Sequence, residues 1–79
     1  MSEEDQERAA AREEAAQNYE RAADELERAA KHLRVTAQHF REGEVPRGCA
    51  HAWAARGHLD SAEQLLQALA QLHAARSQV

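Results

Sequence analysis

The sequence predicts an all-α protein, an antiparallel helical hairpin that associates with further copies into a four-helix bundle. Residues 2–42 contain neither Gly nor Pro and are dominated by strong helix formers: Ala, Glu, Arg, Leu and Gln. A segment containing Gly and Pro follows at residues 43–48. On both sides of that segment, small and large apolar side chains recur every seventh residue, which is the spacing of packed helices.

Local signals define the first helix. Ser2 suits the capping position at its start, and the following acids favour the positive end of the helix dipole. Bulky side chains then form one stripe, and an alanine stripe precedes it by three residues, so we expect these two stripes to form the buried face. The bulky stripe is Tyr19, Leu26, Leu33 and Phe40, the alanine stripe is Ala16, Ala23, Ala30 and Ala37, and a flanking stripe is Ala15, Ala22 and Ala29.

The segment between the helices predicts a tight turn. Gly43 suits the left-handed position after a helix, and Pro46 suits the first turn of the next one. We expect the second helix to run from about Arg47 to Arg76. Its heptad stripes are His51, His58, Leu65 and Leu72 on one line and Ala55, Ala62 and Leu69 on the next, with Leu59 and Leu66 beside them.

Gly57 leaves two alternatives for the second helix. A glycine inside a helix costs roughly 1 kcal/mol relative to alanine. Residues 60–63 also resemble a capping box, which would begin a third helix at about Ser61. The second helix is therefore either continuous through Gly57 or broken there.

The composition predicts self-association. Apolar residues make up 43% of the 79-residue chain, but 19 of them are alanine, so a single copy has few bulky side chains with which to build a core. We expect a homodimer or a higher homo-oligomer, with a helical protein partner as the alternative. The expected interface consists of Tyr19, Leu26, Leu33, Phe40, Leu65, Leu69 and Leu72.

Charge is unevenly distributed. Residues 1–27 carry ten acids and three arginines, whereas residues 28–79 carry four acids and seven basic residues. We expect residues 1–14 to form an acidic helical extension of a hairpin domain over residues 15–79. This extension is either solvated or in contact with the basic half of a neighbouring copy.

The same patterns bear on partners and location. No basic stripe carries interleaved aromatic residues, so we expect no nucleic-acid binding. The apolar runs are too short for a membrane span, and the acidic beginning is unlike a secretory signal. We therefore expect a cytoplasmic protein that does not bind a membrane.

Four of the five histidines obey a mirror relation. If the helices pair about Val45, residues whose numbers add to 90 lie level. His39 then lies level with His51, and His32 lies level with His58, as two rungs roughly 10.5 Å apart. In the stripe assignment above, His51 and His58 lie in the seam, whereas the other two lie at the margin of the buried face.

Three roles remain open for these histidines. Imidazoles on facing helices are typical ligands of Zn, Cu, Ni and Fe, including haem iron, so His51, His58, His39 and His32 are a candidate metal site. The alternatives are structural histidines that set the register of the helices, and a pH-sensitive association.

Catalytic patterns are missing from the sequence. Cys49 and His51 are two residues apart, so they point to different sides of a helix, and no third group orients them. The Glu-x-x-His pattern of di-iron bundles is also absent, because Ala29 and Thr36 stand three residues before the first two histidines. We predict a non-enzymatic, self-assembling scaffold or protein-binding module, with transition-metal or haem binding as the alternative function.

Two segments resemble known families. Residues 52–72, with Gly57 five residues before Ala62, resemble the second half of a tetratricopeptide repeat, although no second copy follows at a period of 34. Residues 19–73 are similar to small bacterial histidine-rich helical proteins. That similarity implies a helical hairpin and favours metal association, without transferring a site. The matching positions are His39, Gly43, His51, Ala52, Gly57 and His58, and the departures are Phe40, Val45 and Pro46.

Overall fold

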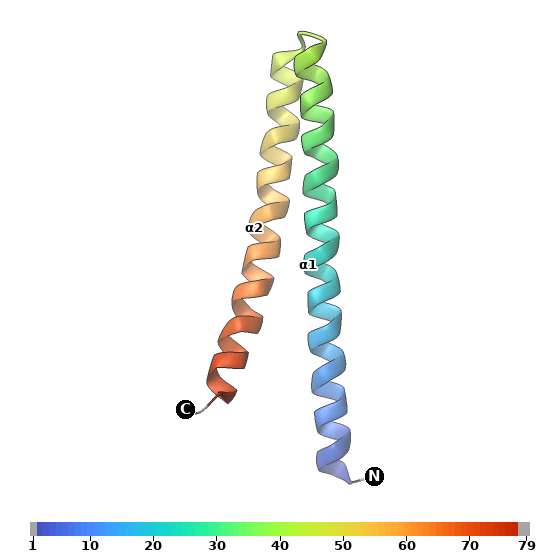
Figure 1. The fold of residues 1–79 in the computed structure, drawn as a ribbon, viewed down its shortest axis with the longest axis vertical. Helices are drawn as coiled ribbons and strands as arrows, with labels where there is room; N and C mark the ends of the chain where they lie inside the picture. Colours follow the sequence, from blue (N-terminus) through green and yellow to red (C-terminus); the bar gives the residue numbers. More distant parts are fainter. Residues whose placement is uncertain (1, 78–79) are drawn as a thin grey trace.

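The chain forms two long α-helices joined by a short turn (Figure 1). This computed structural model describes residues 2–77. Helix α1 spans Glu3–Arg41 and helix α2 spans Val45–Arg76. The helices run antiparallel, and the molecule measures 61 × 27 × 13 Å. The predicted all-α hairpin is confirmed. Among the described residues, neither helix is long and apolar enough to cross a membrane.

The ends of the helices follow from local sequence. The Ser2 hydroxyl accepts a hydrogen bond from the Asp5 backbone N–H at 3.2 Å and so caps α1. At the turn, the Gly43 N–H donates to the Phe40 carbonyl at 3.1 Å, and the Glu44 N–H donates to the His39 carbonyl at 2.8 Å. This pair of bonds is a Schellman motif, which requires the positive φ of 76° that Gly43 adopts.

Helix α2 is continuous through Gly57. The alternative of a break there, with a third helix after it, is therefore wrong for the described residues. A Cβ placed on Gly57 would meet no atom within 4 Å, so the glycine serves neither a turn nor a close approach. Ala55 and Ala62 on either side are buried. Their packing against α1 offsets the roughly 1 kcal/mol by which a glycine weakens a helix.

The contact between the helices is made of small side chains. The buried residues on α1 are Ala22 and Ala29. On α2, the Gly48 carbonyl accepts a hydrogen bond from the Thr36 hydroxyl at 3.0 Å, and this pairing sets the register. We call the buried row the alanine line; its members are Ala22 and Ala29 on α1 and Gly48, Ala55, Ala62 and Leu69 on α2.

The alanine line corrects the stripe expected to be buried on α1. The bulky stripe does not face α2, because the side chain of Tyr19 is 54% exposed and that of Leu33 is 48% exposed. The flanking alanine stripe takes its place. Helix α2 presents its own smallest residues at the contact, and the two backbones approach most closely where small side chains meet small side chains.

Part of the expected extension, residues 1–14, lies beside α2 at the open end of the hairpin. Arg76, at the end of α2, lines a shallow groove together with residues of α1 between Glu4 and Ala15. Helix α2 therefore reaches alongside part of the segment 1–14, and only the first turns of α1 project past it (Figure 1).

Candidate functional site

The alanine line separates two surfaces of the hairpin. Residues four positions after an α1 member of the alanine line lie on one side of the line. Residues three positions after such a member lie on the other side. The first surface, the leucine face, consists of Tyr19, Leu26, Leu33 and Phe40 on α1 with Leu59 and Leu66 on α2. The second, the histidine row, consists of His39, His51, His32 and His58, with Glu44 and Glu25 at its two ends.

The histidine row is one continuous stack of imidazole rings taken alternately from the two helices. The ring centroids of His39 and His51 are 5.4 Å apart, those of His51 and His32 are 5.2 Å apart, and those of His32 and His58 are 5.4 Å apart. The expected pairs are therefore neighbours, but the expectation that they form two separate level rungs is wrong. His32 makes its direct contact with His51, because residues at one level have numbers that add to about 84, as at Thr36 and Gly48, and not to 90. His32 and His39 lie in the contact and not at its margin, because α1 turns its flanking alanine stripe toward α2.

The centre of the row is a direct contact between two imidazole nitrogens. The Nδ1 atoms of His32 and His51 lie 3.0 Å apart. One of them must donate and the other must accept, so at least one of these Nδ1 atoms carries no proton. The geometry therefore suits two neutral rings or one charged ring, and it opposes two charged rings.

A carboxylate stands at each end of the row. His58 donates from Nδ1 to a Glu25 oxygen at 2.6 Å, and Arg28 donates to the other oxygen of Glu25 at 2.8 Å. At the turn, the His39 Nδ1 lies 3.3 Å from a Glu44 oxygen. That nitrogen is buried, and no described group gives it an aligned hydrogen bond.

The electrostatics of Glu25 follow from these contacts. The hydrogen bond from His58 is the main cause that holds the pKa of the Glu25 carboxyl below its ordinary value of 4.5. Partial burial opposes this shift, whereas the charges of His58 and Arg28 reinforce it. Glu25 therefore remains ionised at neutral pH as the acceptor at this end of the row.

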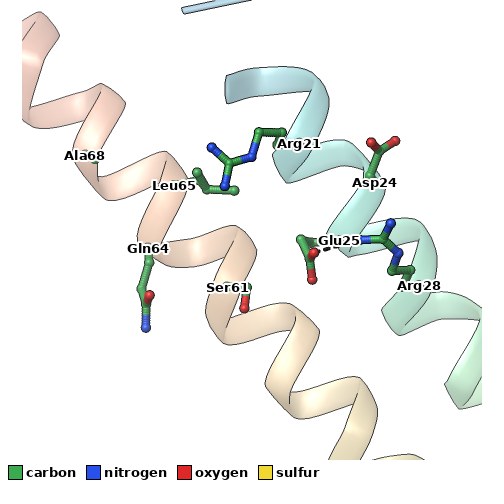
Figure 2. Close-up of a pocket in the computed structure, with 8 residues that line it drawn as sticks. All are labelled: Arg21, Asp24, Glu25, Arg28, Ser61, Gln64, Leu65 and Ala68. Atoms are coloured by element: carbon green, nitrogen blue, oxygen red, sulfur yellow. Dashed lines mark hydrogen bonds and ion pairs between the residues drawn. The ribbon is translucent and has the colours of Figure 1, made fainter. Parts of the chain in front are cut away.

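An open groove leads from the surface to this end of the row. Figure 2 shows Glu25 directed toward α2, with Arg28 beside it and Arg21 extended toward Leu65. The lining is mostly polar and has both signs of charge. The groove therefore gives water access to the Glu25 end of the histidine row. Its lining residues are Arg21, Asp24, Glu25, Arg28, Ser61, Gln64, Leu65 and Ala68.

The row contains groups that can ligate a metal ion. Neutral imidazole nitrogens bind Zn, Cu, Ni and Fe, and the two facing Nδ1 atoms of His32 and His51 are close enough to share one ion. At the turn, one ligand atom each from His39, Glu42 and Glu44 lie within 4.8 Å of one another. Haem does not fit between neighbouring rings, because rings stacked in contact leave no gap for a porphyrin.

The leucine face gathers bulky apolar residues that stay exposed. Each of its residues has between 36% and 54% of its surface exposed. Leu26 of α1 lines a shallow groove with Leu59 and Leu66 of α2, so the two helices contribute to one continuous surface. Near the turn the Phe40 ring covers Gly48, where a Cβ would lie 2.5 Å from the ring.

The expected interface residues do not all lie on one surface. The four on α1 lie on the leucine face. Leu69 is 8% exposed and belongs to the alanine line, and Leu65 is half-buried beside the histidine row. These two contribute to the hairpin itself, whereas Leu72 is 46% exposed. Leu59 and Leu66 were not among the expected interface residues, although their seven-residue spacing was the signal for them.

No protein-family model matches this chain, and neither the curated proteins nor the solved structures contain a match to it.

Proposed function

We propose that this chain is a non-enzymatic, self-assembling helical module, in which two hairpins associate through their leucine faces into a four-helix bundle. One observation carries this proposal. The alanine line buries four alanines, a glycine and one leucine, whereas the bulky apolar side chains of α1 lie outside it. A hairpin alone therefore buries little of the apolar surface that the sequence provides.

The apolar gain on association and its entropic cost are of similar size. Full burial of a large apolar side chain contributes about 1.5–3 kcal/mol, so a half-exposed one gains about 1 kcal/mol when it is covered. The six residues of the leucine face, counted in both copies, would contribute about 10 kcal/mol. Association costs about 4–15 kcal/mol. The mass in solution should therefore depend on concentration.

A second copy is the occupant that suits the surface. On α1, bulky residues and alanines alternate at heptad spacing from Ala16 to Phe40, and this pattern packs knobs of one helix into holes of an identical helix. A helical protein of another kind would have to supply the same pattern. Such a partner is the alternative outcome of the experiment below.

Analytical ultracentrifugation over a wide concentration range tests this proposal. We expect a species of twice the 8.8 kDa chain mass that dissociates on dilution. Leu33→Glu should shift it to monomer, because a carboxylate cannot be buried in an apolar contact. Gln17→Glu introduces the same charge at an exposed position of α1 and should leave the dimer intact. A monomer that melts cooperatively at every concentration would overturn self-association and leave the face to another protein.

The histidine row supports transition-metal binding as a second candidate function. The supporting observation is the 3.0 Å approach of the His32 and His51 nitrogens, with His39 and His58 stacked beside them. Zn, Cu, Ni and Fe are the metals such ligands favour. Titration with Zn²⁺ should release heat in the natural protein and in His73→Ala, and none in His51→Ala. Equal binding by the His51 variant, or no binding at all, would contradict this candidate.

A further inference from the structure

We infer that the two hairpins of the bundle pack head to tail, with α1 of one copy antiparallel to α1 of the other. This inference rests on the proposed self-association and specifies its geometry. It follows from three features of the described residues: which helix carries the more apolar outer seam, where the centre of that seam lies, and how charge is distributed on either side of that centre.

Helix α1 has the more apolar outer seam. From Ala16 to Phe40, every position of the two heptad stripes on that side is alanine, leucine or an aromatic residue. The corresponding surface of α2 includes Arg56 and Glu63, which line the groove beside Leu59 and Leu66. Charged residues are disfavoured at the centre of a bundle. The α1 helices of the two copies therefore occupy the central contact, and α2 contributes at its edge.

The bulky stripe of the seam is symmetric about the middle of the paired region. On α1 it extends from Tyr19 to Phe40, so its centre lies at Ala29 and Ala30. The bond from Thr36 to Gly48 sets the register, so seven residues farther from the turn on each helix Ala29 lies level with Ala55. A two-fold axis through this level would place the bulky stripes of the two copies side by side in the antiparallel sense, with Tyr19 beside the second copy's Phe40.

Charge changes sign at the same level. The half of the hairpin nearest the turn, residues 28–56, carries six basic residues and two acids. The open half, residues 1–27 and 57–79, carries twelve acids and four basic residues. Parallel packing would place the two strongly acidic halves side by side, whereas head-to-tail packing places each acidic half beside a basic one.

One row of charged side chains beside the seam changes sign at this level. Glu20 and Glu27 precede its centre on α1, and Arg34 and Arg41 follow it at the same seven-residue spacing. All four are exposed, and none forms an ion pair within residues 2–77. In the head-to-tail arrangement Glu27 faces the partner's Arg34, and Glu20 faces the partner's Arg41. Such flanking pairs determine the orientation of packed helices.

Distances between spin labels, measured by electron–electron double resonance, test the orientation of the two hairpins directly. A spin label on Gln17→Cys, in a Cys49→Ser background, lies about 13 residues from the centre of the seam. At 1.5 Å per residue, head-to-tail packing separates the two labels by about 40 Å, whereas parallel packing leaves them within about 20 Å. A distance near 40 Å supports the inference. A short distance overturns it and keeps self-association, and the absence of any dipolar signal overturns both.

Charge exchange gives an independent test. Glu27→Arg or Arg34→Glu alone should weaken the dimer about tenfold, because each variant places like charges opposite one another in two symmetric pairs. The double variant Glu27→Arg/Arg34→Glu should restore the natural affinity. In a parallel dimer each residue faces its own copy, so neither a loss nor a rescue would occur. That result would contradict head-to-tail packing even if the dimer remained intact.

Discussion

The leucine face and the histidine row flank the same alanine line, yet the hairpin encloses one of them and leaves the other open. All four histidines of the row are half-buried, whereas every residue of the leucine face is exposed. Both surfaces have heptad spacing. They differ in how their side chains meet across the alanine line.

The physical reason is the direction of the side chains. Small residues let the helices approach closely, and rings that follow the line by three positions on each helix then interleave above it. Residues that follow by four positions lie on the opposite side of the line and keep between 36% and 54% of their surface exposed. The polar row is therefore completed within one chain, whereas the apolar face stays exposed in that chain. The larger side chains of a heptad pattern therefore need not form the intramolecular contact.

Enlarging the alanine line should have the greatest effect on the hairpin. Ala55 is 1% exposed, and Ala55→Leu would force the helices apart, which separates the stacked rings and destabilises the hairpin by about 1–3 kcal/mol. Denaturant unfolding followed by circular dichroism measures this loss. Ala50→Leu makes the same change at an exposed position of α2 and should alter stability by less than about 0.5 kcal/mol. Equal effects of the two variants would show that the alanine line is not closely packed.

Gly57 lies on neither surface. A substitution at this position therefore changes the helix propensity of α2 without changing the packing of the two helices. Nothing lies within 4 Å of a Cβ at this position, so Gly57→Ala should stabilise the protein by about 1 kcal/mol. The gain should appear in thermal unfolding without any change in the oligomer mass. A destabilised variant would indicate that a neighbouring chain approaches this part of α2.

The smallest expected effect concerns the Glu25 end of the row. The pKa of Glu25 is lowered in the folded protein, so its ionised form stabilises the fold above pH 4.5, and this contribution is lost as the pH falls through the lowered value. Glu25→Gln should therefore melt at a lower temperature than the natural protein at pH 7. The difference should shrink progressively as the pH falls below 4.5. A difference that stays constant as the pH is lowered would mean that the ionised carboxylate contributes nothing.

Much of the fold could be predicted from local signals. Ser2 and Gly43 indicate the ends of α1, and the heptad of His51 and Ala55 on α2 lies in the contact as the spacing predicts. The four histidines were also selected by their mirror positions. These features could be predicted because they depend only on residues within one helix or on the position of the turn between the two helices.

Local sequence signals specify two long helices, the turn between them and the set of side chains available for packing. Which stripe of α1 meets α2 depends instead on the contact between the two helices. Two alanine stripes one residue apart, through Ala29 and Ala30, are equally compatible with a buried helix face, because each has a bulky or polar row beside it. The choice depends on Ala55 and Ala62 across the contact, which admit the closer approach. That choice encloses the histidines and leaves the leucine face exposed.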